Sequence, residues 1–349
     1  MRRGVSVVVG LAFMAVLMAS TELEAQTKVY NWKVAMGLSK YKGHFPVDNF
    51  VKAIEKATDG RIRMQYLQPG EHPYSPVDVF KAVRDNVMQI AFTLSIYTQS
   101  VFPQMGFQDL PFMFSADQNE FLAMTKDAGY KDIWEYVMLD PLRQNNQMLM
   151  GWFANPGYMF SGPKWIDDLE SWKGLRVRVY SKPMSEMIKL FNAVPVNVSW
   201  DEVSSALSRK MIDGFLTATT GAYGAKLYEF PTTKWVTMVD WAVGVTWISM
   251  NKKAFDELPK DLQDKVLAAC AEQQPILQEA YNRDDQYATS MMMRNYGVKT
   301  KFMDPALVEQ VRTKMQPIWQ DAAKDMGPKA VDMIKRVNAF HEKYVKEKK

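Results

Sequence analysis

The stretch GLRVRVYSKPMSEMIKLFNAVPVNVSWDEVSSALSRKMIDGF, residues 174–215, alternates strand-like and helix-like patterns. Its start, LRVRVY at 175–180, alternates apolar residues with arginines, which is typical of a half-buried strand. Apolar residues then recur at helical spacing, at Met184, Met187, Ile188 and Phe191. A short strand at 194–198, a second helix and a strand at 212–218 complete the order β-α-β-α-β. This order predicts a parallel sheet with helices packed against it.

The same order of elements is predicted nearer the N-terminus. Strands are expected at 29–36, 62–66 and 88–94, with amphipathic helices between them. Linking strands are expected at 148–153 and 158–162, and the segment 236–251 is also strand-like. The fold class is therefore α/β, with two open sheets and flanking helices.

Two lobes follow from this repetition. The first comprises residues 27–151, with 236–258 crossing back to it, and the second comprises residues 152–235. Residues 259–340 are mostly helical in pattern and are expected to pack across both lobes. They begin with a long helix at about 260–295, which should span both lobes and bend near Pro275.

Residues 1–26 have the pattern of a secretory signal peptide. Arg2 and Arg3 precede an uncharged apolar run at 5–19, and Ala25 stands before a plausible cleavage point. The run is shorter than the roughly 20 apolar residues that span a bilayer, although an uncleaved membrane anchor is the alternative. We therefore expect an exported protein.

The composition argues against several classes of function. Lys and Arg number 43 against 39 Asp and Glu, and this net charge of +4 is spread along the chain, so binding of nucleic acid is not expected. The single cysteine, Cys270, excludes an internal disulfide and a thiolate-rich metal site, and the 3 histidines are far apart in sequence. Motifs for hydrolases, phosphate-binding loops and Cys-x-x-Cys pairs are missing from the sequence. We expect no catalytic residue, metal or cofactor, and a protein that is not an enzyme.

Two α/β lobes create a cleft, and ligands of such sheets bind beyond the carboxyl ends of the strands. The segments that follow the predicted strands are 37–44, 68–72, 93–97, 152–158, 178–182, 217–223 and 240–247. Arg178 is the most informative residue among them, because it lies near the end of its strand and on the face opposite Val177 and Val179. A guanidinium there could hold a carboxylate through two parallel hydrogen bonds. The alternative is an arginine on a solvated strand face.

Other residues at strand ends could contact the remainder of a ligand. The aromatic candidates are Tyr97, Phe153, Tyr158 and Trp241. They could line an apolar pocket, although packing in the core or the hinge is the alternative for such residues. The polar candidates are Gln68, Ser95, Thr217 and His44. Thr217 could equally be a turn residue, and His44 a surface or capping residue.

Residues 174–215 also resemble the core of the substrate-binding subunits of tripartite ATP-independent periplasmic (TRAP) transporters, the DctP family. The family strand Gly-Leu-Lys-x-Arg-Val is similar to GLRVRV, and its later Pro, Glu and Ala-Leu positions are similar to NAVPVNVSWDEVSSAL. Its Val-Asp-Gly is similar to MIDGF. Two segments in the N-terminal half, ATDGRIRMQYLQPGE at 57–71 and VFPQMGFQDLPFMF at 101–114, also resemble family motifs in the same order. The resemblance covers nearly the whole chain after residue 26.

The resemblance implies a two-lobed periplasmic binding protein fold and a periplasmic protein that hands a solute to membrane permease subunits. The arginine with which the family forms a salt bridge to a substrate carboxylate matches Arg178. The family also uses the segment after Asp-Gly, which here contains Thr217. Two departures from the family are the lack of an asparagine near Thr217 and of a second arginine near Tyr158.

These features predict a monomeric binding protein that captures a carboxylate-containing organic acid and closes its lobes around it. The aromatic residues of the cleft favour a monocarboxylate with an apolar or aromatic body. Two alternatives remain open. One is a secreted enzyme acting on small organic acids, with Asp240 or Glu71 as acid and base. The other is a binding protein that reports its ligand to a receptor kinase.

Overall fold

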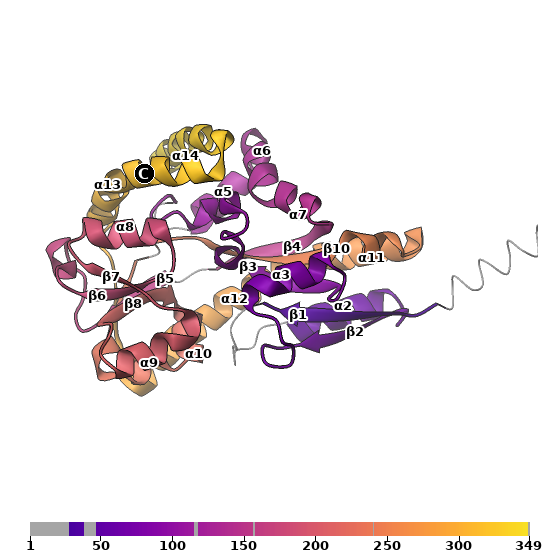
Figure 1. Ribbon diagram of the computed structural model, residues 1–349, viewed down its shortest axis with the longest axis horizontal. Coiled ribbons are helices and arrows are strands. Elements are labelled where there is room, and N and C mark those ends of the chain that lie inside the picture. Colours follow the sequence, from indigo (N-terminus) through magenta and orange to yellow (C-terminus); the bar gives the residue numbers. More distant parts are fainter. Residues whose placement is uncertain (1–27, 38–46, 115–117, 156–157, 240, 348–349) are drawn as a thin grey trace, which may run out of the picture.

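The computed structural model describes residues 28–37, 47–114, 118–155, 158–239 and 241–347, and shows two α/β lobes side by side (Figure 1). The predicted signal peptide at 1–26, together with His44 and Asp240, lies outside the described residues. No helix in these described ranges is both long enough and apolar enough to span a bilayer.

The first lobe is built on a five-stranded sheet of order β2-β1-β3-β10-β4. Its strands are β1 (Tyr30–Met36), β2 (Ile62–Leu67), β3 (Ile90–Leu94), β4 (Gln147–Asn155) and β10 (Gly244–Asn251). Strand β1 pairs in parallel with β2 and β3, whereas β10 runs antiparallel to β3 and β4. The helices between the parallel strands are α2 (Val47–Ala57) and α3 (Pro76–Arg84). The β-α-β-α-β order expected from the sequence is present, with β10 and β4 added to it.

The second lobe is built on a six-stranded sheet of order β11-β9-β5-β8-β6-β7. Its strands are β5 (Tyr158–Gly162), β6 (Arg176–Val179), β7 (Val194–Asn197), β8 (Gly214–Ala218), β9 (Trp235–Met238) and β11 (Lys299–Phe302). The parallel unit β6-β7-β8 is the one predicted from residues 174–215, and its helices are α8 (Lys182–Leu190) and α9 (Val203–Ser208). Helix α10 (Thr219–Gly224) follows β8 directly.

The chain crosses between the two sheets at places that differ from the expected boundaries. Strand β4 belongs wholly to the first sheet, so the crossing follows Asn155 and not residue 151. The strand expected at 236–251 is two strands, because β9 pairs with β5 in the second sheet and β10 pairs with β3 in the first. Only the second part of that segment therefore returns to the first lobe.

Helix α12 (Lys260–Tyr296) is 37 residues long and contains Pro275, as the sequence predicts. It packs on β4 and α2 of the first lobe and on α10 of the second, so it spans both. Two glutamine side chains attach it to the edge strand β4: Gln274 to the backbone of Trp152, and Gln278 to the backbone of Ala154. These bonds pair backbone groups that an edge strand otherwise leaves open.

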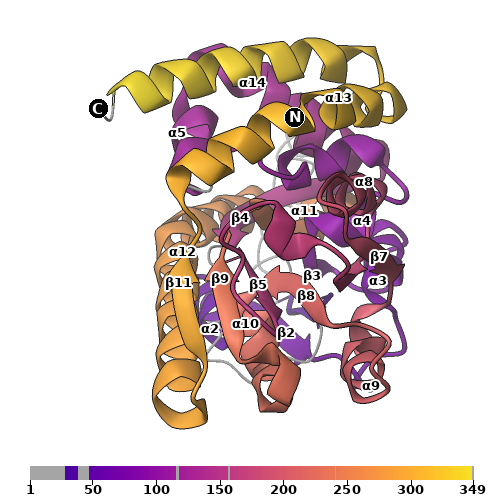
Figure 2. The same cartoon turned by 90° about the vertical axis from the view of Figure 1, so that its left-hand side faces the viewer.

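The C-terminal helices α13 (Pro305–Met326) and α14 (Pro328–Glu347) lie together over one end of both lobes (Figure 2). Helix α13 packs on α8 of the second lobe and on the 3-10 helix η1 (Pro103–Asp109) of the first. Helix α14 packs on α5 (Gln118–Lys126). The remaining elements are short: α4 (Ser95–Thr98), η2 (Ala128–Tyr130), α6 (Lys131–Trp134), η3 (Glu135–Leu139), α7 (Asp140–Gln144), η4 (Glu170–Trp172), η5 (Trp200–Glu202), η6 (Leu227–Glu229), η7 (Pro231–Thr233) and α11 (Lys252–Asp256).

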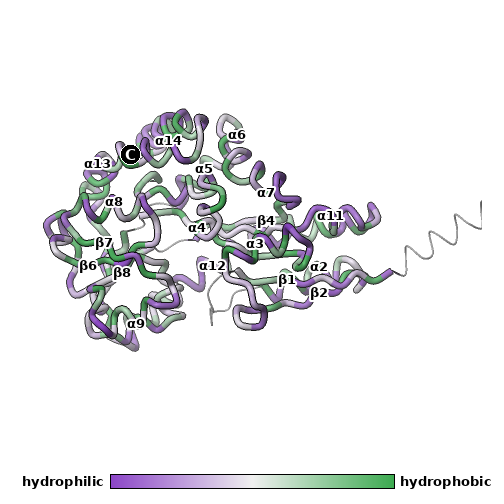
Figure 3. Tube along the Cα trace, viewed as in Figure 1, coloured by the Kyte–Doolittle hydropathy of each residue, from purple (hydrophilic) through white to green (hydrophobic). Residues whose placement is uncertain are grey.

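The central strands of both sheets are buried on both faces. Every residue of β10 is buried, and Val177 and Val179 of β6 are 0% and 1% exposed. Hydrophobic residues run along the strands, whereas short helices such as α11 are largely hydrophilic (Figure 3). The two cores therefore hold the strand ends in place, and it is these ends that form the site.

Candidate functional site

A cavity of about 110 Å³ lies between the lobes and is lined by residues of both. The first lobe contributes the ends of β1 and β3 and the start of α4, through Met36, Leu94, Ile96 and Tyr97. The second contributes Arg178, Tyr180, Trp200, Thr217, Ala218, Thr220 and Gly221. Asn155 and Tyr158 come from the first crossing, and Tyr281 comes from α12. The lining is mostly aromatic and aliphatic, and Arg178 is the only charged residue among the described residues that form it.

Arg178 is held at the cavity wall by the strand on which it lies. It is 4% exposed, and its Nε donates a hydrogen bond of 3.1 Å to the carbonyl of Val198. Among the described residues it has no carboxylate partner, and its two terminal nitrogens make no hydrogen bond. Burial lowers the pKa of this guanidinium from its usual value, while Tyr180 and Tyr97 act in the opposite direction. A buried cation without a counter-ion is costly, so this group favours the entry of an anion.

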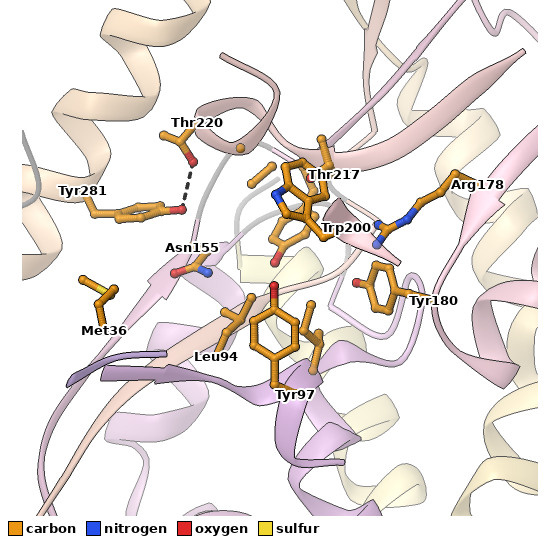
Figure 4. Close-up of a pocket in the computed structure, with 14 residues that line it drawn as sticks. Met36, Leu94, Tyr97, Asn155, Arg178, Tyr180, Trp200, Thr217, Thr220 and Tyr281 are labelled. Carbon is orange, nitrogen blue, oxygen red and sulfur yellow. Dashed lines mark hydrogen bonds between the residues drawn. The ribbon is translucent and has the colours of Figure 1, made fainter. Parts of the chain in front are cut away.

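Aromatic rings enclose the guanidinium. The ring of Tyr180 lies 4.7 Å from the guanidinium carbon of Arg178, and the ring of Trp200 lies 5.6 Å from it. Both distances fit cation–π contacts, which strengthen as water is excluded. Figure 4 shows these three side chains together on one side of the cavity.

Arg176 differs from Arg178 although the two lie on the same strand. Its Nη2 is 2.6 Å from Oδ1 of Asp213, and its Nε is 3.0 Å from Oδ2 of the same carboxylate. This bidentate ion pair raises the pKa of Arg176 and lowers the pKa of Asp213. The aspartate of the MIDGF motif therefore holds β6 and the start of β8 together, whereas Arg178 is left for the cavity.

The other side of the cavity carries polar groups that are already hydrogen-bonded. The hydroxyls of Thr220 and Tyr281 are 2.9 Å apart, joining the second lobe to α12 (Figure 4). The Thr246 hydroxyl donates to Oδ1 of Asn155 at 3.2 Å, and the Asn155 side chain also bonds the hydroxyl of Tyr158. Burial raises the pKa of both Tyr158 and Tyr281, so they remain neutral phenols. This side can orient an uncharged part of a ligand.

The structure brings Arg178, Tyr97, Tyr158 and Thr217 together at the cavity. Trp241 does not line it: the indole is 1% exposed and packs edge-on behind Tyr158, with ring centres 5.3 Å apart. Phe153 is fully buried in the core of the first lobe, where its ring packs against that of Tyr281 with ring centres 5.3 Å apart.

Two polar candidates also lie away from the cavity. Gln68 is exposed in the turn after β2, where its backbone N–H donates to Glu71. Glu71, a residue considered above as a possible acid or base, is thus part of that turn and not of the site. Ser95 is buried, and its hydroxyl accepts from the backbone N–H of Val245 at 3.3 Å.

Several lining residues were not singled out from the sequence. Tyr180, Asn155 and Thr220 fall within segments expected after strands, but nothing in their spacing separates them from their neighbours. Trp200 follows β7 and could have been found by the same rule. Tyr281 has no such signal, because it lies in the middle of α12 and reaches the cavity only through the packing of that helix.

Two lobes share a cavity at their strand ends, and its wall carries the cation of Arg178, which has no carboxylate partner in the described part of the chain. These features define a solute-binding protein of the two-lobed class. The model of the family "Bacterial extracellular solute-binding protein, family 7" (DctP) matches residues 39–325. The chain belongs to this family, and its expected relation to TRAP solute-binding proteins is confirmed.

Relatives and solved structures agree with this assignment. A solute-binding protein of Albidiferax ferrireducens is 22% identical over 293 residues, which cover 81% of each chain. The 2,3-diketo-L-gulonate-binding periplasmic protein YiaO of Escherichia coli is 23% identical over 329 residues, which cover 92% of this chain and 94% of that protein. The solved structure of DctP7, a Bordetella pertussis extracytoplasmic solute receptor binding pyroglutamic acid, has a TM-score of 0.75. It is 19% identical and covers 90% of this chain and 100% of its own.

A second solved structure shows the same fold. The sugar acid binding protein DctPAm of Advenella mimigardefordensis, in complex with galactonate, has a TM-score of 0.76 at 19% identity. The likeness covers 90% of this chain and 99% of that one. The predicted two-lobed α/β fold is therefore confirmed.

Proposed function

We propose that this chain is the periplasmic solute-binding subunit of a TRAP transporter and that it captures a small monocarboxylate with an apolar or aromatic body. The observation that carries the proposal is Arg178, a buried guanidinium in the cavity wall with no carboxylate partner among the described residues. A bound carboxylate would accept from its two terminal nitrogens and neutralise the charge.

The rest of the cavity supports a single carboxylate. Arg178 is the only charged residue in the described part of the lining, so a second carboxylate would lose hydration without gaining a partner among these residues. Tyr97, Trp200 and Leu94 offer apolar surface instead of the many hydrogen bonds that a polyhydroxy acid needs.

Solved relatives place carboxylate ligands in this class of fold. DctP7 binds pyroglutamic acid and DctPAm was solved in complex with galactonate, and each of these acids carries one carboxylate. Between these two, the apolar lining of the present cavity favours a compact ring such as pyroglutamate or benzoate over a sugar acid.

The capture would proceed by lobe closure without chemical change of the ligand. The solute first meets Arg178, and the aromatic residues of both lobes then exclude water, which strengthens the ion pair. We take the protein to act as a monomer after export through its N-terminal segment, with membrane permease subunits as its partner. Light scattering coupled to size exclusion measures the oligomeric state, and a dimer would contradict this part.

Isothermal titration calorimetry with benzoate, pyroglutamate, galactonate and succinate tests the proposal. The wild-type protein is expected to bind one or both of the first two acids more tightly than the others. Arg178→Ala is expected to lower that affinity by at least about a hundredfold, because charged hydrogen bonds are lost. Arg209→Ala is the control, since it removes an equal charge from an exposed residue of the same lobe. Equal binding by Arg178→Ala and wild type would show that the site is wrong, and turnover of a bound acid would point to an enzyme.

A further inference from the structure

A second cavity, of about 500 Å³, is lined by both lobes and by α13. Its lining includes Gln99, Ser100 and Pro103 of the first lobe, the start of α8 in the second, and the C-terminal half of α13. Among the described residues, Tyr180 is the one that lines both this cavity and the ligand cavity of about 110 Å³. Its side chain therefore stands at the boundary between the two spaces.

The position of Tyr180 in the chain fixes its ring at this boundary. The residue directly follows β6, and residues two positions apart on an extended chain share a face, so its side chain lies on the same side as that of Arg178. The next residue, Ser181, caps α8 by accepting from the backbone N–H of Met184. Regular elements thus hold the backbone on both sides of Tyr180. Figure 4 shows its ring beside Arg178 at the edge of the ligand cavity.

Tyr180 is held by contacts of its ring and not by its hydroxyl. The centre of the ring is 4.7 Å from the guanidinium carbon of Arg178 and 6.0 Å from the ring centre of Trp241. The hydroxyl is buried and has no hydrogen-bond partner among the described residues. Phenylalanine would therefore keep the ring contacts and remove an unpaired polar atom. A small residue would instead remove the side chain that separates the two cavities.

The second cavity suits an uncharged chain better than a second carboxylate. Its apolar lining residues are Pro103, Pro183, Pro317, Ile318, Ala322 and Met326. Lys182 is the only cation in the described part of the lining, and its Nζ already lies 3.3 Å from a carboxylate oxygen of Asp321 and 3.6 Å from one of Asp325. An alkyl chain entering this space would lose contact with water at apolar walls. A carboxylate entering it would find that cation already paired.

We propose that Tyr180 is a specificity-determining residue whose ring ends the ligand cavity and thereby limits the length of the acid that the site accepts. The proposal rests on the function proposed above and adds the residue that sets the size of the solute. With the ring in place, the body of an acid held by Arg178 stays within the ligand cavity. Without the ring, the body extends into the second cavity.

Calorimetric titrations with butyrate, hexanoate and octanoate test this inference, because these acids differ only in length. The wild-type protein is expected to bind octanoate at least about tenfold more weakly than butyrate. Tyr180→Ala is expected to reverse this order, with an affinity that rises about fourfold for each methylene that enters the second cavity. Tyr180→Phe keeps the ring and is expected to keep the wild-type order.

Two controls separate the loss of the wall from other effects of the substitution. Tyr130 also lies against an arginine, with its ring centre 5.5 Å from the guanidinium carbon of Arg336, but it lines neither cavity. Tyr130→Ala should therefore keep the wild-type order. Suberate has the length of octanoate and a second carboxylate, and Tyr180→Ala should not improve its binding.

Three outcomes would overturn the proposal: equal binding of octanoate and butyrate by the wild type, weaker binding of octanoate than of butyrate by Tyr180→Ala, or an equal gain for suberate and octanoate in that variant. If Tyr180→Ala does not fold, Tyr180→Leu replaces it, because leucine is shorter than tyrosine and still apolar. The gain for octanoate over wild type is then expected to be smaller but of the same sign, and its absence would contradict the proposal.

If no monocarboxylate binds to the wild type, the proposed ligand class is wrong, which is a separate failure. Crystal structures of the ligand-free wild type and of Tyr180→Ala then test the wall directly. One continuous cavity from Arg178 to α13 in the variant, and two separate cavities in the wild type, would support the proposal. A variant in which other side chains still separate the two cavities would overturn it.

Discussion

Nε of Arg178 donates to the backbone carbonyl of Val198 across 3.1 Å. Arg178 is on β6, Val198 directly follows β7, and these two strands lie side by side in parallel. The bond fixes the plane of the guanidinium, so that its two terminal nitrogens are oriented before a ligand arrives. Preorganisation of this kind reduces the entropy lost on binding.

Arg178→Lys tests this geometric role. Lysine keeps the charge but cannot bond Val198 and present two parallel donors at the same time. We expect the affinity for a monocarboxylate to fall about ten- to a hundredfold, less than for Arg178→Ala, because the Coulomb attraction remains. Calorimetry measures the affinity. Wild-type affinity in Arg178→Lys would show that charge alone is recognised.

The hydrogen bond between Thr220 and Tyr281 joins the second lobe to α12 and is expected to stabilise the ligand-bound arrangement. Thr220→Val and Tyr281→Phe each remove one partner. A double-mutant cycle on ligand binding should give a coupling of about 0.5–1.5 kcal/mol, the usual net value of such a bond. Tyr287→Phe, the same change at a half-exposed position of α12, serves as control. Strict additivity of the two substitutions would contradict the role of the bond.

Gly244 provides the space that the hydroxyl of Tyr158 occupies, since a Cβ at this position would overlap that oxygen. Gly244→Ala is therefore expected to lower the free energy of unfolding by about 1–3 kcal/mol through overpacking. Adding Tyr158→Phe should recover part of the loss, because the overlapping atom is removed. Urea denaturation of the two single variants and the double variant measures this. A double variant no more stable than Gly244→Ala would contradict the steric explanation.

The Arg176–Asp213 ion pair predicts a contribution to acid stability. Because Arg176 lowers the pKa of Asp213, the folded state holds its proton less tightly than the unfolded chain does. The stabilisation is present above the usual pKa of 3.8 and is lost as the pH falls below it. Thermal unfolding of the wild type should thus weaken more steeply below about pH 4 than that of Asp213→Asn. Parallel curves would show that the pair is not linked to folding.

The sequence predicts those parts of the fold and site in which a local pattern has one structural solution. The alternation in LRVRVY places Val177 and Val179 in the core and Arg178 on the opposite face, and the structure has this arrangement. The long helix is likewise predicted from periodicity and from Pro259 before it. The solvated environment considered for Arg178 applies instead to Arg176, whose side chain is 42% exposed.

The remaining features depend on packing between segments that are distant in sequence. Trp241 and Phe153 are aromatic and lie near strand ends, yet both side chains are buried in the core. The position of a residue along its strand does not determine which segments of the chain pack over its side chain. Tyr281 reaches the site from α12, more than 100 residues from Arg178.

Helix α12 is attached to β4 by hydrogen bonds of Gln274 and Gln278, and its C-terminal half packs on the second lobe. The attachment lies near the middle of this 37-residue helix. Pro275, beside this attachment, lacks a backbone donor, so the helix can bend there without breaking the rest of its hydrogen-bond ladder. Movement of the lobes relative to each other would bend the helix at this point. The strain of the bent helix would then favour the one arrangement of the lobes in which the helix is relaxed.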